Sequence, residues 1–243
     1  MKNILTSVCL LLALFSSSVL TAQTQVDPAE IASTVPELTS FHEIIFPMWH
    51  NAYPAQDYDA LKALVPKIKS SMASINKAEL PGILREKETV WKTRLDELNN
   101  SARNYYTAAE KNDDKALLAA AEELHAGYEK MVRAIRPALK EIDDFHQTLY
   151  VIYHKLYPEG KYDEISRLEA TLVAKARAIA DYPQDNLKSR LGDNAGKYDA
   201  LSRALYDSTI SLGEALKGTD QKKKEEAVVS MHNAYEELNS LFE

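Results

Sequence analysis

The side chains best suited to binding chemistry are six histidines, which fall at matching positions in two halves of the chain. Segments 41–59 and 145–163 align without gaps at an offset of 104, and they share two histidines, several aromatic residues and a Tyr-Pro pair. Segments 125–129 and 232–236 align at an offset of 107. The aligned pairs are His42 with His146, His50 with His154, and His125 with His232. Because this pairing uses every histidine, we infer an internal duplication.

Helical spacing limits which histidines can share a ligand. His42 and His50 are eight residues apart, which is about 12 Å along a helix and too far for two imidazoles on one metal ion. An antiparallel bundle places the end of its first helix beside the start of its fourth. Counting residues from that end pairs His42 with His125, and the same count pairs His146 with His232.

The predicted ligands form one set in each half. Glu129 follows His125 by one helical turn, and Glu236 follows His232 in the same way, so each carboxylate can share a face with its histidine. Two imidazoles and a carboxylate suit zinc or another first-row divalent metal ion. The predicted metal ligands are His42, His125 and Glu129 in the first half and His146, His232 and Glu236 in the second, with His50 and His154 as points of access or second sites.

Two other roles for the histidines stay open. Together with the nearby Tyr128 and Tyr235, they can be buried packing residues of a structural, interaction or sensor module. A four-helix bundle can also hold haem between helix-borne histidines, although the chain has no Cys-x-x-Cys-His motif for covalent attachment. Metal binding is favoured over both.

Recognisable catalytic motifs are missing from the sequence. It contains no Gly-x-Ser-x-Gly, no His-Glu-x-x-His and no glycine-rich phosphate loop. Glu122-x-x-His125 has the spacing of a di-iron ligand pair, but Val229 stands at the matching position of the second half. We therefore predict a non-enzymatic binding protein for a metal ion or small ligand.

Helix breakers and apolar periodicity predict four helices in each half. The expected helices span 36–53, 57–77, 80–111 and 114–135, then 138–157, a stretch ending near 181, 184–217 and 221–242. Pro66 is expected to kink the second of them. Short loops predict an all-α fold of two tandem antiparallel, up-down-up-down four-helix bundles, with domains at 36–136 and 137–243 that are joined stiffly across Arg136 and Pro137. This architecture resembles that of periplasmic four-helix bundles, cytochromes among them, but no motif indicates a particular family.

The first 22 residues have the layout of a secretory signal peptide. Lys2 precedes an apolar stretch from Ile4 to Phe15, and small and polar residues lead to a predicted cleavage after about Ala22. No later segment reaches the ~18 apolar residues of a membrane span, so we expect an exported, periplasmic or extracellular chain without a transmembrane segment. The single cysteine, Cys9, lies in the signal peptide, so no thiolate site is expected. A net charge of −7 without a sustained basic run argues against nucleic-acid binding.

Overall fold

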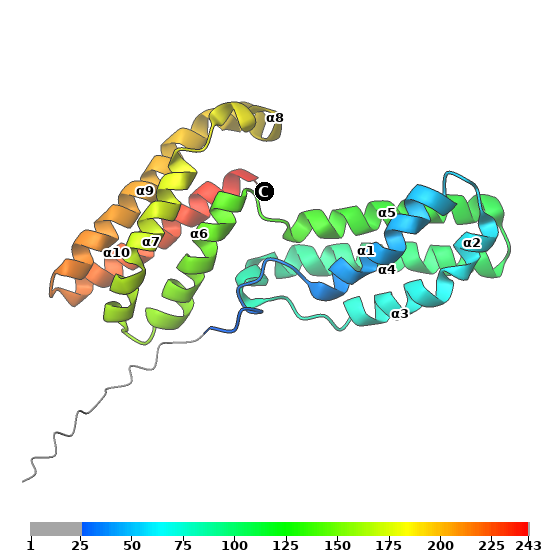
Figure 1. The fold of residues 1–243 in the computed structure, drawn as a ribbon, viewed down its shortest axis with the longest axis horizontal. Helices are drawn as coiled ribbons and strands as arrows, with labels where there is room; N and C mark the ends of the chain where they lie inside the picture. Colours follow the sequence, from blue (N-terminus) through cyan, green and yellow to red (C-terminus); the bar gives the residue numbers. More distant parts are fainter. Residues whose placement is uncertain (1–25, 243) are drawn as a thin grey trace, which may run out of the picture.

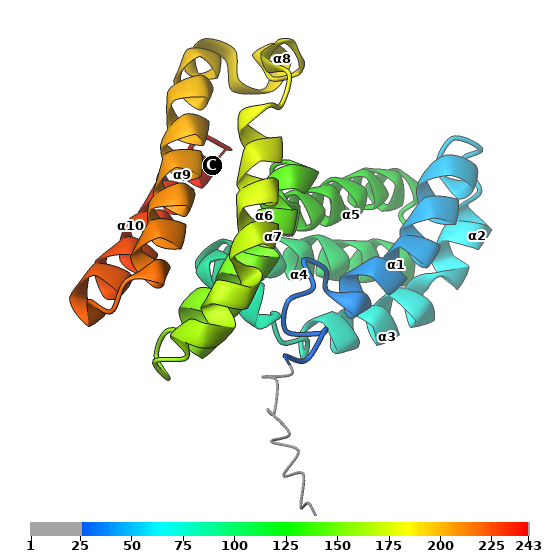
Figure 2. The ribbon, with the colours of Figure 1, turned by 60° about the vertical axis from the view of Figure 1, so that its left-hand side comes forward.

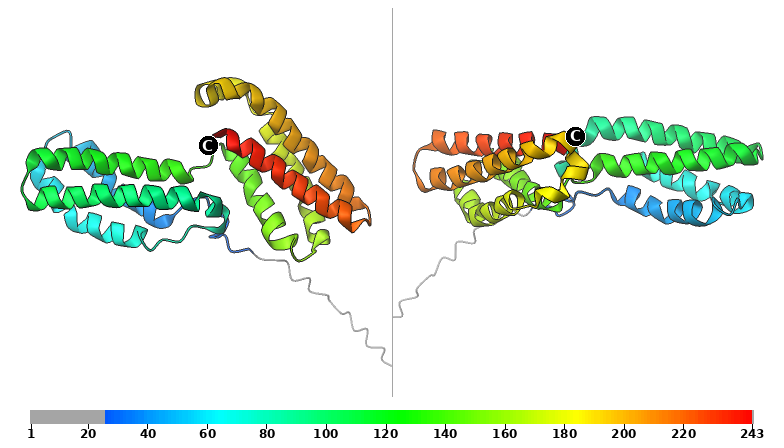
Figure 3. Two further views of the ribbon diagram at one scale, coloured as in Figure 1. Left: turned by 180° about the vertical axis from the view of Figure 1, so that it is seen from behind. Right: turned by 90° about the horizontal axis from the view of Figure 1, so that it is seen from above.

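A computed structural model describes residues 26–242 of the protein, apart from the side chain of Gln184. Over this range the chain forms helices and connecting turns and no β-strand, which confirms the predicted all-helical class. The predicted signal peptide lies outside the described residues. Seen from above, the helices form two groups that lie end to end (Figure 3).

The first group of helices, α1 to α5 in Figure 1, encloses one hydrophobic core. It consists of α1 (Pro36–Pro47), the π-helical turn η1 (Met48–Ala52), α2 (Tyr58–Ala63), α3 (Val65–Ile75), the 3₁₀ helix η2 (Gly82–Lys87), α4 (Glu88–Glu110) and α5 (Asp114–Ile135). Around this core, α1 contacts α3 and α5, and α4 contacts the same two helices. Phe41, Ile68 and Leu98 are completely buried there.

The second group encloses its own core in the same neighbour order, in which α6 and α9 each contact both α7 and α10. It consists of α6 (Lys140–Val151), the π-helical turn η3 (Ile152–Leu156), α7 (Tyr162–Ala180), η4 (Gln184–Asn186), α8 (Lys188–Leu191), η5 (Gly192–Asn194), α9 (Ala195–Lys217), α10 (Gln221–Asn239) and η6 (Ser240–Phe242). Phe145, Leu172 and Leu205 are completely buried there.

Local sequence explains where the helices begin and where two of them depart from prediction. Asp113 caps α5 by accepting a hydrogen bond from the amide of Ala116 at 3.0 Å. The break between α2 and α3 lies at Leu64, two residues before the expected kink at Pro66. Helix α4 begins at Glu88 and α9 at Ala195, later than expected, because an extended Pro81 and the positive φ of Gly192 interrupt the chain before them.

Each group contains one π-helical turn, and the two turns lie at corresponding positions of the aligned segments. The amide of Tyr53 bonds to the carbonyl of Met48 at 2.8 Å, and the amide of Tyr157 bonds to that of Ile152 at the same distance. The two turns are 104 residues apart, the offset at which the histidine segments align. Such turns are frequent at functional sites, and these two contain His50 and His154.

The two groups meet where η2 and the N-terminal segment pack on α6, beside the ends of α4 and α5 (Figure 2). Tyr150 belongs to α6, yet its ring is buried in the core of the first group. Its hydroxyl donates to Glu30 at 2.8 Å and accepts a hydrogen bond from Arg85. Lys155 also donates to Glu30, at 2.6 Å, so that two side chains of the second group hold one carboxylate of the first.

The covalent link between the groups is an extended, non-helical segment. Arg136 and Leu139 have extended backbone angles between the last turn of α5 and the first of α6. The stiff connection expected across Arg136 and Pro137 is therefore not one continuous helix. The side-chain contacts around Tyr150 fix the junction. Within residues 26–242, no helix is both long and apolar enough to cross a membrane.

Replacing Gly82 with alanine should weaken this junction. A Cβ atom at that position would overlap the hydroxyl of the buried Tyr150 and lie 2.9 Å from Cγ of Glu30. We expect Gly82→Ala to lower the free energy of unfolding by about 1–3 kcal/mol, as overpacking does elsewhere. Urea unfolding followed by circular dichroism measures the change.

Gly196→Ala is the matched control. A Cβ atom at Gly196, in the first turn of α9, meets nothing within 4 Å, so alanine there should be neutral or slightly stabilising. Equal stability of the two variants would show that the close approach at Gly82 does not constrain the fold.

Candidate metal centre

Every histidine of the described chain lies against an aromatic ring. His125 stacks on Trp49 with ring centroids 4.2 Å apart, and its counterpart His232 stacks on Tyr153 at 3.7 Å. The aligned pairs of the repeat therefore make the same contact in both halves. Stacking on a planar ring fixes the orientation of each imidazole.

Within the described residues, the predicted ligands of the first half form no group of three that could hold a metal ion. His42 is exposed and stacks on Tyr128 at 5.9 Å, and the exposed His50 packs on Phe46 at 4.5 Å. The carboxylate of Glu129 lies 3.6 Å from Arg133. His125 is half-buried; burial lowers its pKa, and the charges of Glu129 and His50 also act on it.

The predicted ligands of the second half are closer together. His146 stacks on Tyr235 at 4.5 Å, and the ring of His154 lies 6.2 Å from that of the buried His232. An oxygen of Glu236 lies 3.7 Å from Nδ1 of His232, so this carboxylate does share a face with its histidine, as expected.

Glu86 completes a group of three ligands with His154 and His232. One ligand atom of each residue lies within 4.8 Å of those of the other two. The three come from η2, η3 and α10, which are far apart in the sequence. Because zinc ligands at about 2.1 Å are spaced about 3.4 Å apart, binding requires the ligand atoms to approach one another by at most about 1.4 Å. Such movements are within the range of small rotations about χ angles.

Burial favours the neutral imidazole, the form that binds metals, at His154, His146 and His125. Burial is the main reason that the pKa of His154 is lowered to about 4, and the positive charge of Arg85 lowers it further. Burial also lowers the pKa of His146 to about 3, with smaller contributions from His154 and His232. The pKa of His125 is lowered for the same main reason.

Arg85 occupies one side of His154. Its Nη1 lies 3.1 Å from Nδ1 of the imidazole. A guanidinium can only donate, so Nδ1 is the acceptor and the proton resides on Nε2. In this arrangement Arg85 competes with any cation for the lone pair of His154.

The structure pairs the histidines of neighbouring helices differently from the residue count made on the sequence. The count assumed that the fourth helix of each bundle begins level with the end of the first. In the structure α5 begins beside α2, where Lys62 lies 3.1 Å from Asp114. His125 is therefore brought to the level of Trp49 rather than His42, and in the second half His232 groups with His154.

Sequence reasoning missed Glu86 and Arg85. Both lie outside the aligned histidine segments, and they belong to the opposite half of the chain from the histidine that they approach. The offset of 107 aligns Glu86 with Asp193, which is a weak signal of a repeated acidic position. Asp193 is exposed. In the described part of the chain it does not belong to any group of three possible metal ligands.

Comparisons of the chain with protein-family models, with curated proteins and with solved structures found no match. The function must therefore be argued from the site itself.

His146 should make the fold sensitive to acid. Above its ordinary pKa of 6.5 the imidazole is neutral in both folded and unfolded chains, so it has no effect on stability. Below that pH the unfolded chain takes up a proton that the folded chain refuses until about pH 3, so stability is lost as the pH falls through this window. We expect His146→Gln to reduce the loss of unfolding free energy between pH 7.5 and 4.5 by about 1–2 kcal/mol. Urea unfolding at both pH values tests this, and an unchanged loss would contradict it.

Proposed function

We propose that this protein is an exported, non-enzymatic binding protein for a transition-metal ion, and that Glu86, His154 and His232 hold the ion. The convergence of these three side chains from three elements is the observation that carries the proposal. Two imidazoles and one carboxylate are a common ligand set for zinc and related ions, which leaves a fourth position for water or a ligand. Export is supported by the sequence pattern of residues 1–22.

The stacked ring of Tyr153 supports this site from the side. It lies 3.7 Å from the ring of His232 and 5.1 Å from that of His154, so it contacts both candidate ligands. A neighbouring group that fixes ring orientation strengthens binding. Glu236, at 3.7 Å from Nδ1 of His232, is placed to orient the ring when the other nitrogen binds the ion.

We also propose that the two halves are duplicated four-helix bundles whose metal chemistry has diverged. The matching π-helical turns and the matching stacks of His125 and His232 support a common origin. The two halves nevertheless differ, because η2 supplies a carboxylate to the second half alone. We therefore expect one ion per chain.

A packing role for the histidines is the second candidate function. It is favoured by the ring contacts, above all the parallel stack of His125 on Trp49 with an interplanar angle of 8°. In that case the protein is a structural or interaction module. Haem is less well supported, because Trp49 and Tyr153 fill the space against the helix-borne histidines that a macrocycle would need.

Metal titration distinguishes these candidates. We expect the native chain to bind one equivalent of Co²⁺, with an absorption spectrum typical of tetrahedral nitrogen and oxygen ligation, and to exchange it for Zn²⁺. Glu86→Gln is a conservative change at an exposed position, and it should weaken binding by at least about tenfold because it removes a charged ligand. Asp193→Asn, at the aligned position, should leave the affinity unchanged.

A histidine pair provides the matching ligand control. His154→Ala should abolish tight binding, whereas His50→Ala, at the equivalent position in the first half, should not. If both variants lose affinity equally, or if the native chain binds no Co²⁺ while His154→Ala is destabilised, the packing role is the correct one.

Removing Arg85 should have the opposite effect on affinity. Its guanidinium holds the lone pair of His154 and adds a positive charge beside the site. We expect Arg85→Gln to strengthen Zn²⁺ binding several-fold, because the ion no longer displaces a cation while the bonds of Tyr150 and Lys155 to Glu30 still hold the junction. Isothermal titration calorimetry measures the change, and weaker binding would mean that Arg85 positions His154 productively.

A further inference from the structure

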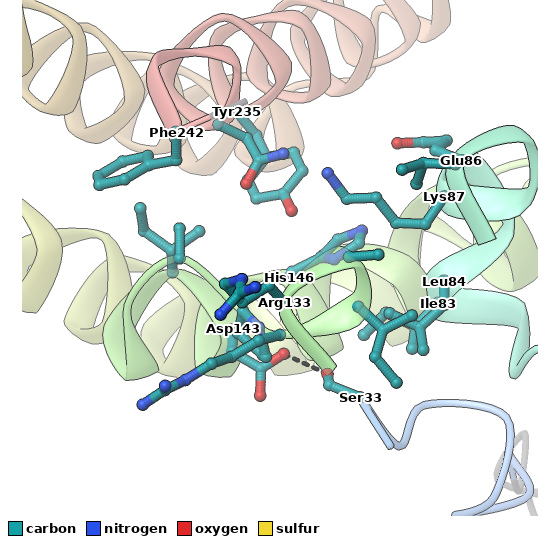
Figure 4. Close-up of a pocket in the computed structure, with 18 of the residues that line it drawn as sticks. Ser33, Ile83, Leu84, Glu86, Lys87, Arg133, Asp143, His146, Tyr235 and Phe242 are labelled. Atoms are coloured by element: carbon teal, nitrogen blue, oxygen red, sulfur yellow. Dashed lines mark hydrogen bonds between the residues drawn. The ribbon is translucent and has the colours of Figure 1, made fainter. Parts of the chain in front are cut away.

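A cavity of about 700 Å³ lies between the two groups of helices. Its walls come from η2 and α4, the last turn of α5, the link at 136–138, the start of α6, α8 and the C-terminal end of the chain. Figure 4 shows side chains from opposite walls, among them Lys87 and Tyr235, pointing into the same space. Glu86 is the one residue that this cavity shares with the proposed metal centre.

The lining of the cavity is basic, although the chain as a whole has a net charge of −7. Four cationic side chains, contributed by η2, α5, the link and α8, face two carboxylates. The cationic residues are Lys87, Arg133, Arg136 and Arg190, and the acidic ones are Glu86 and Asp143. The three arginines alone outnumber the two carboxylates, and this excess of positive charge favours an anion.

Both carboxylates of the lining have other roles. Asp143 accepts hydrogen bonds from Ser33 and, at 3.0 Å, from Gln147. Glu86 lies in the group with His154 and His232. The ion pair of Arg133 is made with Glu129, which does not line the cavity.

Two arginines of the lining keep their charge uncompensated. Arg190 donates to the carbonyl of Ala138 and lies 5.5 Å from the centre of the Phe242 ring, and neither contact neutralises it. Arg136 is exposed and has no ion-pair partner within residues 26–242. The ion pair of Arg133 with Glu129 has a distance of 3.6 Å and lies on an exposed surface, where such pairs are weak.

The remaining walls are apolar. They are formed by Ile83, Leu84, Val90, Ile135, Ile142 and Phe242. Concave sites of a few hundred cubic ångströms, with apolar walls and a few convergent polar groups, are typical of small-molecule binding. A simple inorganic anion would leave these walls in contact with water.

We infer that this cavity binds a small organic anion with an apolar body, such as a medium-chain carboxylate. Arg136 and Arg190, the two arginines without an ion-pair partner, hold its charged group through charge-assisted hydrogen bonds, and Ile83, Ile142 and Phe242 contact its apolar body. This inference does not rest on the proposed function, because the site requires no metal ion.

The test uses 1-anilinonaphthalene-8-sulfonate, a fluorescent organic anion, as the probe for the full chain without added metal. We expect saturable binding with one probe per chain and displacement by octanoate. The variant Arg136→Gln/Arg190→Gln should bind the probe at least about tenfold more weakly, because both partners of the sulfonate are lost. The control Lys67→Gln/Arg167→Gln removes two exposed positive charges outside the cavity and should change the affinity less than about twofold.

Three outcomes would overturn the proposal: equal affinity in both double variants, displacement of the probe by sulfate as readily as by octanoate, or binding of many probes per chain. The first would place the probe elsewhere. The second would indicate an inorganic anion site, and the third would indicate unspecific adsorption. Circular dichroism of each variant confirms that the comparison is made between folded chains.

Discussion

The burial of the Tyr150 side chain across the junction is the constraint on which the arrangement of this molecule depends. Its ring leaves α6 to enter the core of the first group of helices. A tyrosine hydroxyl in such a place needs partners, and Glu30 and Arg85 supply them. Lys155 adds a second bond to Glu30. These side-chain contacts hold the two groups together, because the extended link between α5 and α6 does not by itself fix their relative position.

Fixing η2 against α6 has chemical consequences on both sides. On one side it brings Glu86 to His154 and His232, which creates the three-ligand group. On the other side it closes the basic cavity between η2, α6 and α10. Both proposed sites therefore lie where the two groups meet. A ligand in either site would contact both groups, so that binding would stabilise their relative position.

The two halves show how similar segments acquire different chemistry. Histidine–aromatic stacks recur at equivalent positions, as do the π-helical turns. His50 and Phe46 are nevertheless exposed on α1 and η1, whereas their counterparts His154 and Tyr150 are covered by η2. Coverage lowers the pKa of His154 to about 4 and provides it with Arg85 and Glu86 as neighbours. The difference arises from what lies over each helix rather than from the helix itself.

The sequence by itself determined the helical class, most helix limits and the residues that recur, because these follow from local propensity, capping and periodicity. It also identified His154, His232 and Glu236 as candidate ligands, since the alignment of the two halves can be read from the sequence alone. Only the tertiary structure decided which histidines meet, because their level depends on α5 beginning beside α2. It also decided that Glu86 and Arg85 belong to the site, since they reach across the junction from the other half. No spacing along a chain reveals a contact that depends on how two helical groups pack on each other.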